Sequence, residues 1–536
     1  MASSTPDEFA RTAHRARAAD AATVVVPIGI RVLSDQLTPV LAYRRLVSAD
    51  ERTAPSFLLE SVVGGDRQGR HSILGTRPIL ELWSHAGETT ITDHREGTTQ
   101  THRCDDPLAR LRGLTDGWVQ AVPEHAIERG LLPDCVLGGW FGSAGYDSVR
   151  FTERVKLDPA RAPGDDRGLP DMTMGFYDTL VVFDHVTKLV HLVRLAVVGG
   201  ADDPARVYER SLADLDALSG EIQRHTRPLP LGRVERAGRD APEPMASNTT
   251  RAEHAEMVRR AKDYIDAGDI FQVVLGQRFE RRSDSDPFDV YRALRAVNPS
   301  PYMVYMQARG MILVASSPEI LCRVRRAGDR LVVTNRPLAG TRRRGATPDE
   351  DAALARELLA DPKERAEHAM LVDLGRNDVG RVAEPGTVSL DALMEIERYS
   401  HVMHISSTIT GRIREGLDAA DALRAALPAG TISGAPKIRA MQIIDELEKT
   451  RRGPYGGGLG WISLDGEMDM ALALRTIVVP VAMRSERDPR GAWVYHIQSS
   501  GGIVADSEPG AEYDETVNKA AAMSRAIDLA QDAFAG

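Results

Sequence analysis

The sequence contains few cysteines, and they lie far apart. Cys104, Cys135 and Cys322 are the three cysteines among 536 residues, and no Cys-x-x-Cys pair occurs. A disulfide framework or a thiolate zinc site is therefore not expected. None of the three lies in a Gly-x-Cys-x-Gly turn of the kind that presents a nucleophile. This cysteine usage is typical of a protein in a reducing cytoplasm.

Long apolar runs and an excess of basic residues are also missing. No apolar run approaches the length that spans a bilayer, and the first residues lack the basic and apolar regions of a secretory signal. We therefore expect a soluble cytoplasmic protein with no membrane partner. The 77 acidic residues outnumber the 67 basic ones, which gives a formal charge of −10. That balance argues against a nucleic-acid partner, although it permits a small acidic substrate because local arginines decide such binding.

The chain is longer than one ordinary domain. Residues 1–20 are polar and alanine-rich and are expected to form a flexible extension. Residues 21–225 form the predicted N-terminal lobe, 226–249 a proline-bearing linker, and 250–536 the predicted C-terminal domain. Strand and helix patterns are mixed without regular βαβ alternation, which predicts an α+β fold.

Two acidic pairs stand out in the C-terminal half. Asp361-Pro362 is typical of a helix start, and on that helix Glu364 and Glu367 share a face. Glu512 and Glu515 repeat the spacing at the head of a helix predicted to end near residue 534. By spacing alone, solvated faces are the commoner outcome. The alternative is a hard cation between the pairs, because carboxylates are ligands that Mg2+ takes.

Three further side chains have a functional and a structural interpretation. Glu319 follows a strand at a tight turn, where a helix N-cap is the favoured interpretation when the segment is taken alone. His404 lies in an extended segment, where a satisfied core histidine is the commoner outcome. Arg475 lies inside an apolar strand, which implies an anionic partner, either a ligand or an internal carboxylate.

Four glycine-bearing or basic segments complete the set. The basic segment 336–345 is either a phosphate cradle or a solvated turn. The small-residue loop 430–437 enters a helix at Pro436, and its free amide groups suit a carboxylate. Segment 455–460 fails the dinucleotide pattern, because strand-like residues follow it. Segment 498–503 is interpreted as a glycine-bearing turn.

In this order, the segments resemble the chorismate-utilising enzymes, and among them the large subunits of anthranilate synthases. The resemblance covers about residues 250–525 and is thinner in the N-terminal half. It is carried by the motifs DIFQVV, NPSPYM, SSPE, AGT, AEHAMLVDLGRND, VMH, GTISGAPK, YGG, ALRT, GGIVADS and YDETVNK.

The resemblance implies a two-lobed fold of packed antiparallel sheets with surrounding helices, and a set of site residues. Mg2+ would be held by Glu367 and Glu515, with Glu364 and Glu512 in close support. Proton transfer would fall to Glu319 and His404. Contacts to chorismate would come from Gly340, Thr341, Thr431, Tyr455, Arg475, Ser500, Gly501, Gly502 and Lys519. Tryptophan, as a feedback inhibitor, would bind in the N-terminal lobe through Ser61, Pro301, Tyr302 and Met303.

The implied chemistry is that of a lyase. Glu319 would protonate the hydroxyl that leaves chorismate, and His404 would accept the ring proton as pyruvate is expelled. Mg2+ would neutralise the ring carboxylate. Arg475 and Tyr455 would hold the enolpyruvyl carboxylate. The product would be anthranilate, in the first step of tryptophan biosynthesis.

Two positions favour ammonia as the nucleophile. Water-using relatives carry a lysine base where this chain has Gln272, and aminodeoxychorismate synthases carry a nucleophilic lysine where it has Ala339. The alternatives are a 2-amino-2-deoxyisochorismate or aminodeoxychorismate synthase, or a non-catalytic tryptophan-binding regulator. Ser499-Ser500 departs from the family's Gln-Ala-Gly-Ala-Gly turn and bears on pyruvate elimination. The chain shows no glutaminase segment, so a separate glutamine amidotransferase subunit and a hetero-oligomer are expected.

Overall fold

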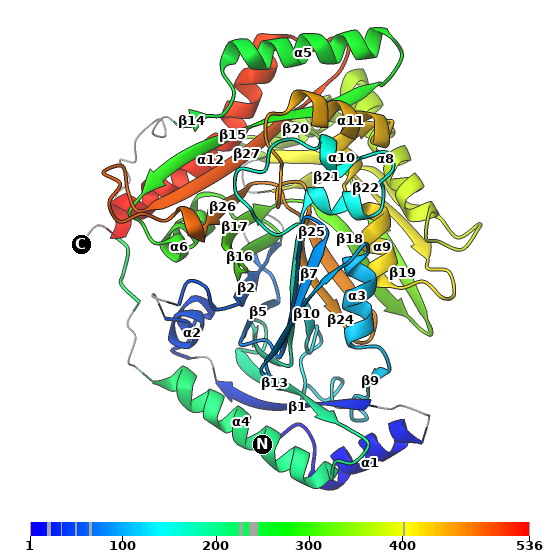
Figure 1. Cartoon of the computed structure of the whole chain (residues 1–536), viewed down its shortest axis with the longest axis vertical. Coiled ribbons are helices and arrows are strands. Elements are labelled where there is room, and N and C mark those ends of the chain that lie inside the picture. Colours follow the sequence, from blue (N-terminus) through cyan, green and yellow to red (C-terminus); the bar gives the residue numbers. More distant parts are fainter. Residues whose placement is uncertain are drawn as a thin grey trace.

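The computed structural model describes residues 2–18, 23–33, 35–48, 51–63, 67–224, 229–234, 245–399 and 402–534. Two large sheets form its centre, and helices cover them (Figure 1). Within the described residues, each pair of named strands is antiparallel except β1 with β9. The predicted α+β class with antiparallel sheets is confirmed.

The 13-stranded sheet joins both halves of the chain, because β2 from the first half pairs with β16 from the second. A further strand, β23 (Gly434–Ala435), pairs with β15. In spatial order the others are β14 (Ala246–Ser247), β15 (Gln272–Ser283), β27 (Trp493–Ile503), β26 (Thr476–Pro480), β17 (Met311–Ser317), β16 (Tyr302–Ala308), β2 (Ser56–Glu60), β5 (His71–Thr76), β12 (Thr179–Asp184), β13 (Leu189–Val198), β1 (Thr23–Leu33) and β9 (Trp118–Gln120).

The 12-stranded sheet also mixes the two halves, through the pairing of β10 with β24. Strand β21 (Ser389–Arg398) pairs with β22 beside the main path. That path runs through β20 (Leu338–Arg343), β22 (Val402–Arg412), β19 (Arg330–Asn335), β18 (Ile320–Ala327), β25 (Met468–Leu472), β24 (Gly458–Ser463), β10 (Gly139–Ala144), β11 (Met172–Tyr177), β6 (Leu80–His85), β7 (Glu88–Asp93) and β8 (Thr98–Arg103). A separate two-stranded sheet contains β3 (Val62–Val63) and β4 (Arg67–Gln68).

The helices are distributed over both halves of the chain. The α-helices are α1 (Pro6–Arg17), α2 (Pro39–Leu46), α3 (Pro107–Leu114), α4 (Pro204–Gln223), α5 (Arg251–Asp266), α6 (Pro287–Val297), α7 (Pro348–Ala360), α8 (Pro362–Gly380), α9 (Ala419–Ala426), α10 (Gly430–Ser433), α11 (Lys437–Leu447) and α12 (Pro509–Phe534). The 3-10 turns in the described part of the chain are η1 (Tyr146–Phe151), η2 (Pro159–Arg161) and η3 (Val481–Met483). Helices α1 and α4 lie at one end of the molecule and α5 at the other (Figure 1).

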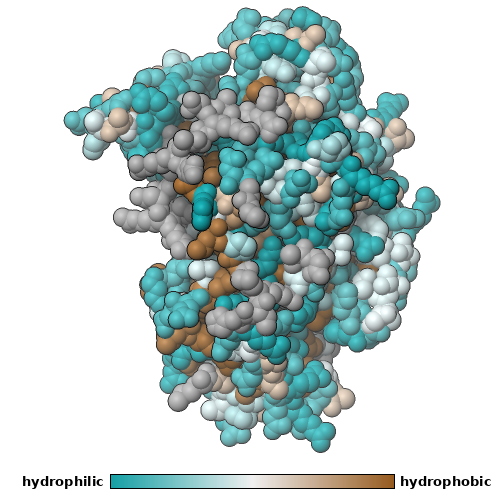
Figure 2. All heavy atoms as spheres, turned by 90° about the vertical axis from the view of Figure 1, so that its left-hand side faces the viewer, coloured by the Kyte–Doolittle hydropathy of each residue, from teal (hydrophilic) through white to brown (hydrophobic). Residues whose placement is uncertain are grey.

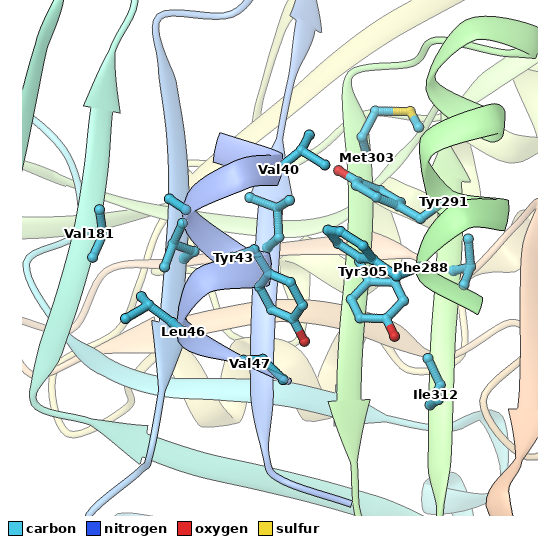
Figure 3. Close-up of a cluster of buried hydrophobic side chains, with 14 of the residues drawn as sticks. Val40, Tyr43, Leu46, Val47, Val181, Phe288, Tyr291, Met303, Tyr305 and Ile312 are labelled. Carbon is cyan, nitrogen blue, oxygen red and sulfur yellow. The ribbon is translucent and has the colours of Figure 1, made fainter. Parts of the chain in front are cut away.

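One apolar core unites the two halves. Tyr43 of α2 stacks on Phe288 of α6, with ring centroids 4.9 Å apart, and meets Tyr305 of β16 edge-on at 5.3 Å. Figure 3 shows these rings between α2, α6 and the strands beneath them. The two sheets also meet directly, because Phe57 of β2 stacks on Phe141 of β10 at 4.2 Å. The halves of the sequence therefore share both sheets and do not form separate units.

The expectation for residues 1–20 is wrong over most of their length. Thr5 caps helix α1, Pro6 occupies its first turn, and Phe9 and Ala13 are fully buried. Phe9 packs 5.5 Å from the ring of Tyr208 on α4. A four-residue spacing of apolar side chains made this helix amphipathic, and burying that face orders it.

The predicted linker 226–249 is described only in part, since Pro228, Pro242 and Pro244 lie outside the described residues. Its last residues join the sheet as β14.

No helix in the described ranges is long and apolar enough to cross a membrane. On the face in Figure 2, hydrophilic residues dominate and hydrophobic ones gather near the middle.

Candidate active site

Glu319 is a buried carboxyl between β17 and β18, so it does not cap a helix. Its exposed fraction is 6%, and the Thr431 hydroxyl at α10 donates to its Oε1 at 3.1 Å. Burial raises the pKa of Glu319 to about 8, although the bonds from Thr431 and the Leu338 backbone oppose the rise. A carboxyl of this kind is protonated near neutral pH and can act as an acid.

His404 of β22 is oriented by the segment that follows Leu338. Its Nδ1 lies 2.8 Å from the Gly340 carbonyl oxygen and 3.1 Å from the Thr341 hydroxyl. Because a carbonyl can only accept, Nδ1 carries the proton, which leaves Nε2 free as a base. Burial and the charge of Arg475 lower the pKa of His404 to about 4, despite the bond to Gly340. The imidazole is therefore neutral at physiological pH.

Tyr399 brings the acid, the base and the arginine together. Its hydroxyl donates to the carbonyl of Pro318, next to Glu319, at 3.4 Å, and its ring lies 5.5 Å from that of His404. It is also close enough to favour the charged form of Arg475. Burial lowers the pKa of Arg475, and among the described residues no acidic side chain is an electrostatic partner for it. Its positive φ of 46° is a strained backbone conformation. The internal-carboxylate alternative for Arg475 is thus not supported.

The acidic pair on α8 faces the site. The Asp361 side chain accepts from the amides of residues 363 and 364, which confirms the predicted cap. Gln272 of β15 donates to Oε1 of Glu367 at 3.2 Å. Burial raises the pKa of Glu367, and the charges of Glu364 and Glu515 raise it further. Glu364 itself accepts a bond from Arg342 at 3.1 Å.

The second acidic pair approaches the same place from α12. A Cβ at Gly501 would lie 3.1 Å from Oε2 of Glu512 and 3.9 Å from Oε1 of Glu515. At Gly502 it would lie 2.6 Å from Nε2 of Gln272, the residue that contacts Glu367. Gly501 therefore leaves room for the carboxylates of α12, and Gly502 leaves room for the Gln272 amide that contacts Glu367 of α8. A side chain at residue 501 would crowd the carboxylates of α12, and one at residue 502 would crowd Gln272.

These carboxylates fit a magnesium ion. Oε2 of Glu512 is buried without a hydrogen-bond partner, and burial and Glu515 raise its pKa. No group of three or more His, Cys, Asp or Glu among the described residues forms a complete metal site. Mg2+ commonly takes only one or two carboxylates and completes its shell with water and substrate oxygens. The donor set is therefore adequate for Mg2+.

Lys519 and the end of β27 complete this side. The Lys519 Nζ lies 2.6 Å from Oε1 of Glu515 and donates to the Ser500 carbonyl at 3.0 Å. The Ser500 side chain is buried. Tyr455 lies beside Ser500, and burial raises the pKa of Tyr455 to about 12. Residues 498–503 are part of strand β27, so the prediction of a turn there is wrong. These residues pair with β15 along an antiparallel register, although glycines are more typical of turns.

A cavity of about 660 Å³ lies beside this site, and all four residues expected to bind tryptophan line it. Those residues are Ser61, Pro301, Tyr302 and Met303. Asp469 accepts from the Tyr302 hydroxyl at 3.0 Å. The wall of the cavity also includes Pro318 and Tyr399, which border Glu319 and His404.

The basic segment 336–345 is not a free anion cradle. Arg342 pairs with Glu357, Asp361 and Glu364. Arg343 pairs with Glu350, and Arg344 with Asp351. Carboxylates of α7 and α8 thus neutralise the three consecutive arginines.

Sequence reasoning missed Tyr399 and the buried pair Glu448–Arg452. Arg452 is 2% exposed and donates to the Ile432 carbonyl at 2.7 Å, next to Thr431. Neither residue lies in a helix, so no local pattern in the sequence signals this pair.

Comparisons with known proteins place this geometry in a family. The model of the chorismate binding enzymes matches residues 57–525. The chain therefore belongs to the chorismate binding enzyme family, as predicted.

Three similar proteins are anthranilate synthase subunits. The chain is 50% identical over 528 residues to the chloroplastic anthranilate synthase alpha subunit 1 of Arabidopsis thaliana, covering 96% of this chain and 87% of the relative. It is 49% identical over 522 residues to the corresponding protein of Oryza sativa subsp. indica, covering 95% and 89%. It is 44% identical over 511 residues to anthranilate synthase component 1 of Pseudomonas aeruginosa, covering 94% and 96%.

Solved structures agree on the fold. The crystal structure of anthranilate synthase component I from Streptococcus pneumoniae matches with a TM-score of 0.69 and 34% identity, covering 92% of this chain and 99% of that one. MenF, the menaquinone-specific isochorismate synthase of Escherichia coli, matches with a TM-score of 0.63 at 19% identity, covering 97% and 100%. The latter match supports the fold alone.

Proposed function

We propose that this chain carries out the anthranilate synthase reaction, the first step of tryptophan biosynthesis. It converts chorismate and ammonia to anthranilate and pyruvate, as a lyase. The identity to anthranilate synthase subunits supports this reaction. The observation that carries it is the buried Glu319, which has the protonation state that departure of the chorismate hydroxyl needs.

Glu319 is the general acid of the first step. Nitrogen attacks C2 of chorismate while the hydroxyl at C4 leaves, and that oxygen must take a proton. Because the pKa of Glu319 is raised to about 8, it still holds a proton at neutral pH. The Thr431 hydroxyl fixes one carboxyl oxygen at 3.1 Å and stabilises the carboxylate that remains after transfer.

His404 is the base of the second step. Loss of the C2 proton and of enolpyruvate makes the ring aromatic. Nε2 of His404 accepts that proton, because Nδ1 is committed to the Gly340 carbonyl. Its pKa of about 4 keeps the imidazole neutral and available.

Charged and small residues orient the substrate. Arg475 and Tyr455 bind the enolpyruvyl carboxylate. Arg475 is available for this role because it has no carboxylate partner among the described residues. Gly340, Thr341, Ser500, Gly501 and Gly502 leave room for chorismate at close range, and Lys519 supports the strand through the Ser500 carbonyl.

Glu367 and Glu515 would hold Mg2+, with Glu364 and Glu512 beside them. When bound, Mg2+ would supply a positive charge to the ring carboxylate next to the carbon that is attacked. The unpartnered Oε2 of Glu512 and the mutual repulsion of these carboxylates support that assignment.

Two neutral residues favour ammonia. Gln272 contacts Glu367 through its amide and cannot deprotonate water. Ala339, on β20, cannot form a covalent intermediate. The Ser499–Ser500 departure makes 2-amino-2-deoxyisochorismate the second candidate product, because Ser500 adds a buried hydroxyl beside Tyr455.

The partner is a glutamine amidotransferase subunit that supplies ammonia, in a hetero-oligomer. The names of the relatives as alpha subunits and first components support a multi-subunit enzyme. Tryptophan binds the cavity lined by Ser61, Pro301, Tyr302 and Met303 and inhibits the enzyme. A cytoplasmic location stays a prediction.

The deciding experiment is an assay of the purified chain with chorismate, ammonium at high pH and Mg2+. We expect fluorescent anthranilate and stoichiometric pyruvate without any partner. A product that retains its pyruvyl group by mass would indicate 2-amino-2-deoxyisochorismate or aminodeoxychorismate synthesis. Tryptophan binding by a folded sample that never consumes chorismate would indicate a regulator and contradict the proposal.

A further inference from the structure

A fully enclosed ion pair lies behind the candidate site. Arg452 Nε donates to Oε2 of Glu448 at 2.9 Å, and Nη2 donates to Oε1 at 2.6 Å. The side chains are 1% and 4% exposed. The face of the guanidinium lies 4.7 Å from the ring centre of Tyr146. Burial opposes the charge of Arg452, but Glu448 outweighs it, so the pKa of Arg452 is raised. Arg452 therefore remains charged.

The remaining donors of Arg452 join two site elements. Nη1 donates to the Ile432 carbonyl of α10 at 2.7 Å, and Nη2 donates to the Val274 carbonyl of β15 at 2.7 Å. Glu448 in turn accepts from the Gly276 amide of β15 at 2.9 Å. The pair thus fixes the spacing between α10 and β15 through three backbone groups.

Each element held in this way carries a site residue close by. Ile432 follows Thr431, whose hydroxyl contacts Glu319 at 3.1 Å. Val274 is two residues from Gln272, whose amide contacts Glu367 at 3.2 Å. Arg452 touches neither Glu319 nor Glu367. The planar guanidinium of Arg452 is required here, because its three nitrogens donate to partners in different directions. The ammonium group of a lysine would offer a single nitrogen.

We propose that Glu448–Arg452 is a positioning pair, which holds Thr431 at hydrogen-bond distance from Glu319 and so sets the strength of that acid. The role rests on the proposed function of Glu319. A purely structural pair would lower stability and activity together. A positioning pair acts through Thr431, so its effect disappears when the Thr431 hydroxyl is absent.

The test is a double-mutant cycle between Arg452→Lys and Thr431→Val, with kcat/KM for chorismate measured across pH at constant free ammonia. We expect Arg452→Lys to reduce kcat/KM at least about tenfold when Thr431 is present and less than about twofold when it is replaced. In the pH profile of kcat/KM, the fall at alkaline pH should move to higher pH in either single variant. It should move no further in the double variant.

A second readout is independent of turnover. Infrared difference spectra should show the protonated carboxyl band of Glu319, assigned by its loss in Glu319→Gln, with a titration midpoint that rises in Arg452→Lys. If the wild type does not consume chorismate, the proposed function is wrong. The infrared titration of Glu319 would still test whether Glu448 and Arg452 position Thr431. Arg52→Lys is the matched control, because Arg52 is a buried arginine paired with Asp286 and outside the site.

Equal losses from Arg452→Lys with and without the Thr431 hydroxyl, or an unmoved titration midpoint, would overturn the proposal. If Arg452→Lys does not fold, as judged by circular dichroism, Glu448→Gln replaces it. In that variant Arg452 keeps its hydrogen bonds to the Ile432 and Val274 carbonyls, but loses the negative charge that holds the guanidinium in place. It should shift the titration midpoint in the same direction by a smaller amount, and no shift would contradict the pair's role.

Discussion

The Thr431 hydroxyl donates to Oε1 of Glu319 at 3.1 Å, inside a site where burial raises the pKa of that carboxyl to about 8. The bond favours the charged carboxylate and so opposes the effect of burial. Proton donation by Glu319 therefore depends on a balance between burial, which raises the pKa, and the hydrogen bonds from the Thr431 hydroxyl and the Leu338 backbone, which lower it.

The pH dependence follows from this balance. Glu319 must be protonated, so kcat/KM should fall as pH rises through about 8. His404 must be neutral, so it should fall as pH drops through about 4. Thr431→Val removes a bond to the charged form, which should move the alkaline limb to higher pH. A profile at constant free ammonia measures both limbs, and an unmoved alkaline limb would remove Thr431 from this role.

The same raised pKa makes a stability prediction. Between about 4.5 and 8, the folded chain binds the Glu319 proton and the unfolded chain does not. This residue's contribution to the free energy of unfolding should therefore fall with rising pH across that window. Glu319→Gln has no such proton, so its stability should decline less steeply. Urea titrations at several pH values give the comparison, and parallel slopes would contradict a raised pKa.

Glu319→Gln should also abolish most turnover without unfolding the chain. An amide has nearly the shape of the protonated carboxyl but cannot donate the proton, so kcat should fall on the order of 10²–10⁴-fold. Chorismate binding, measured by calorimetry, should remain. Full activity would show that the leaving oxygen takes its proton elsewhere.

Local signals in the sequence were sufficient for part of this account. Asp361 and Pro362 define the start of α8 because capping depends on adjacent residues. The contact of Gln272 with Glu367 joins residues 95 positions apart, and no local pattern encodes it.

Other features were lost to competing signals. Helix α1 was missed because its alanine-rich composition concealed the spacing of Phe9 and Ala13. Glycines at 501 and 502 suggested a turn, whereas pairing with β15 keeps them in a strand. Arg452 has partners on three separate elements, so its importance emerges only after folding.

The acidic residues of α12 provide a test of metal dependence. Glu515→Gln removes one proposed ligand charge and breaks the ion pair with Lys519. Turnover should fall to background at Mg2+ concentrations that saturate the wild type. Glu508→Gln, at an exposed glutamate just before the same helix, is the control and should keep the wild-type response to Mg2+. An unchanged Mg2+ requirement in Glu515→Gln would exclude it as a ligand.

The cavity beside the site predicts a separable regulatory variant. Ser61 lines it, and loss of one hydrogen bond to a charged inhibitor costs about 1.5–3 kcal/mol. Ser61→Ala should therefore raise the tryptophan concentration for half inhibition at least about tenfold and leave kcat/KM for chorismate unchanged. Ser84→Ala, a buried serine outside the cavity wall, should leave inhibition as it was. Equal inhibition in the two variants would move the tryptophan site elsewhere.

The most direct test is anomalous diffraction from crystals of the chain grown with chorismate and with Mn2+ in place of Mg2+. Our account predicts one anomalous peak within bonding distance of a carboxylate oxygen of Glu367 and of one of Glu515, with the ring carboxylate and water completing the shell. A peak that touches neither glutamate, or none at full occupancy of chorismate, would contradict it.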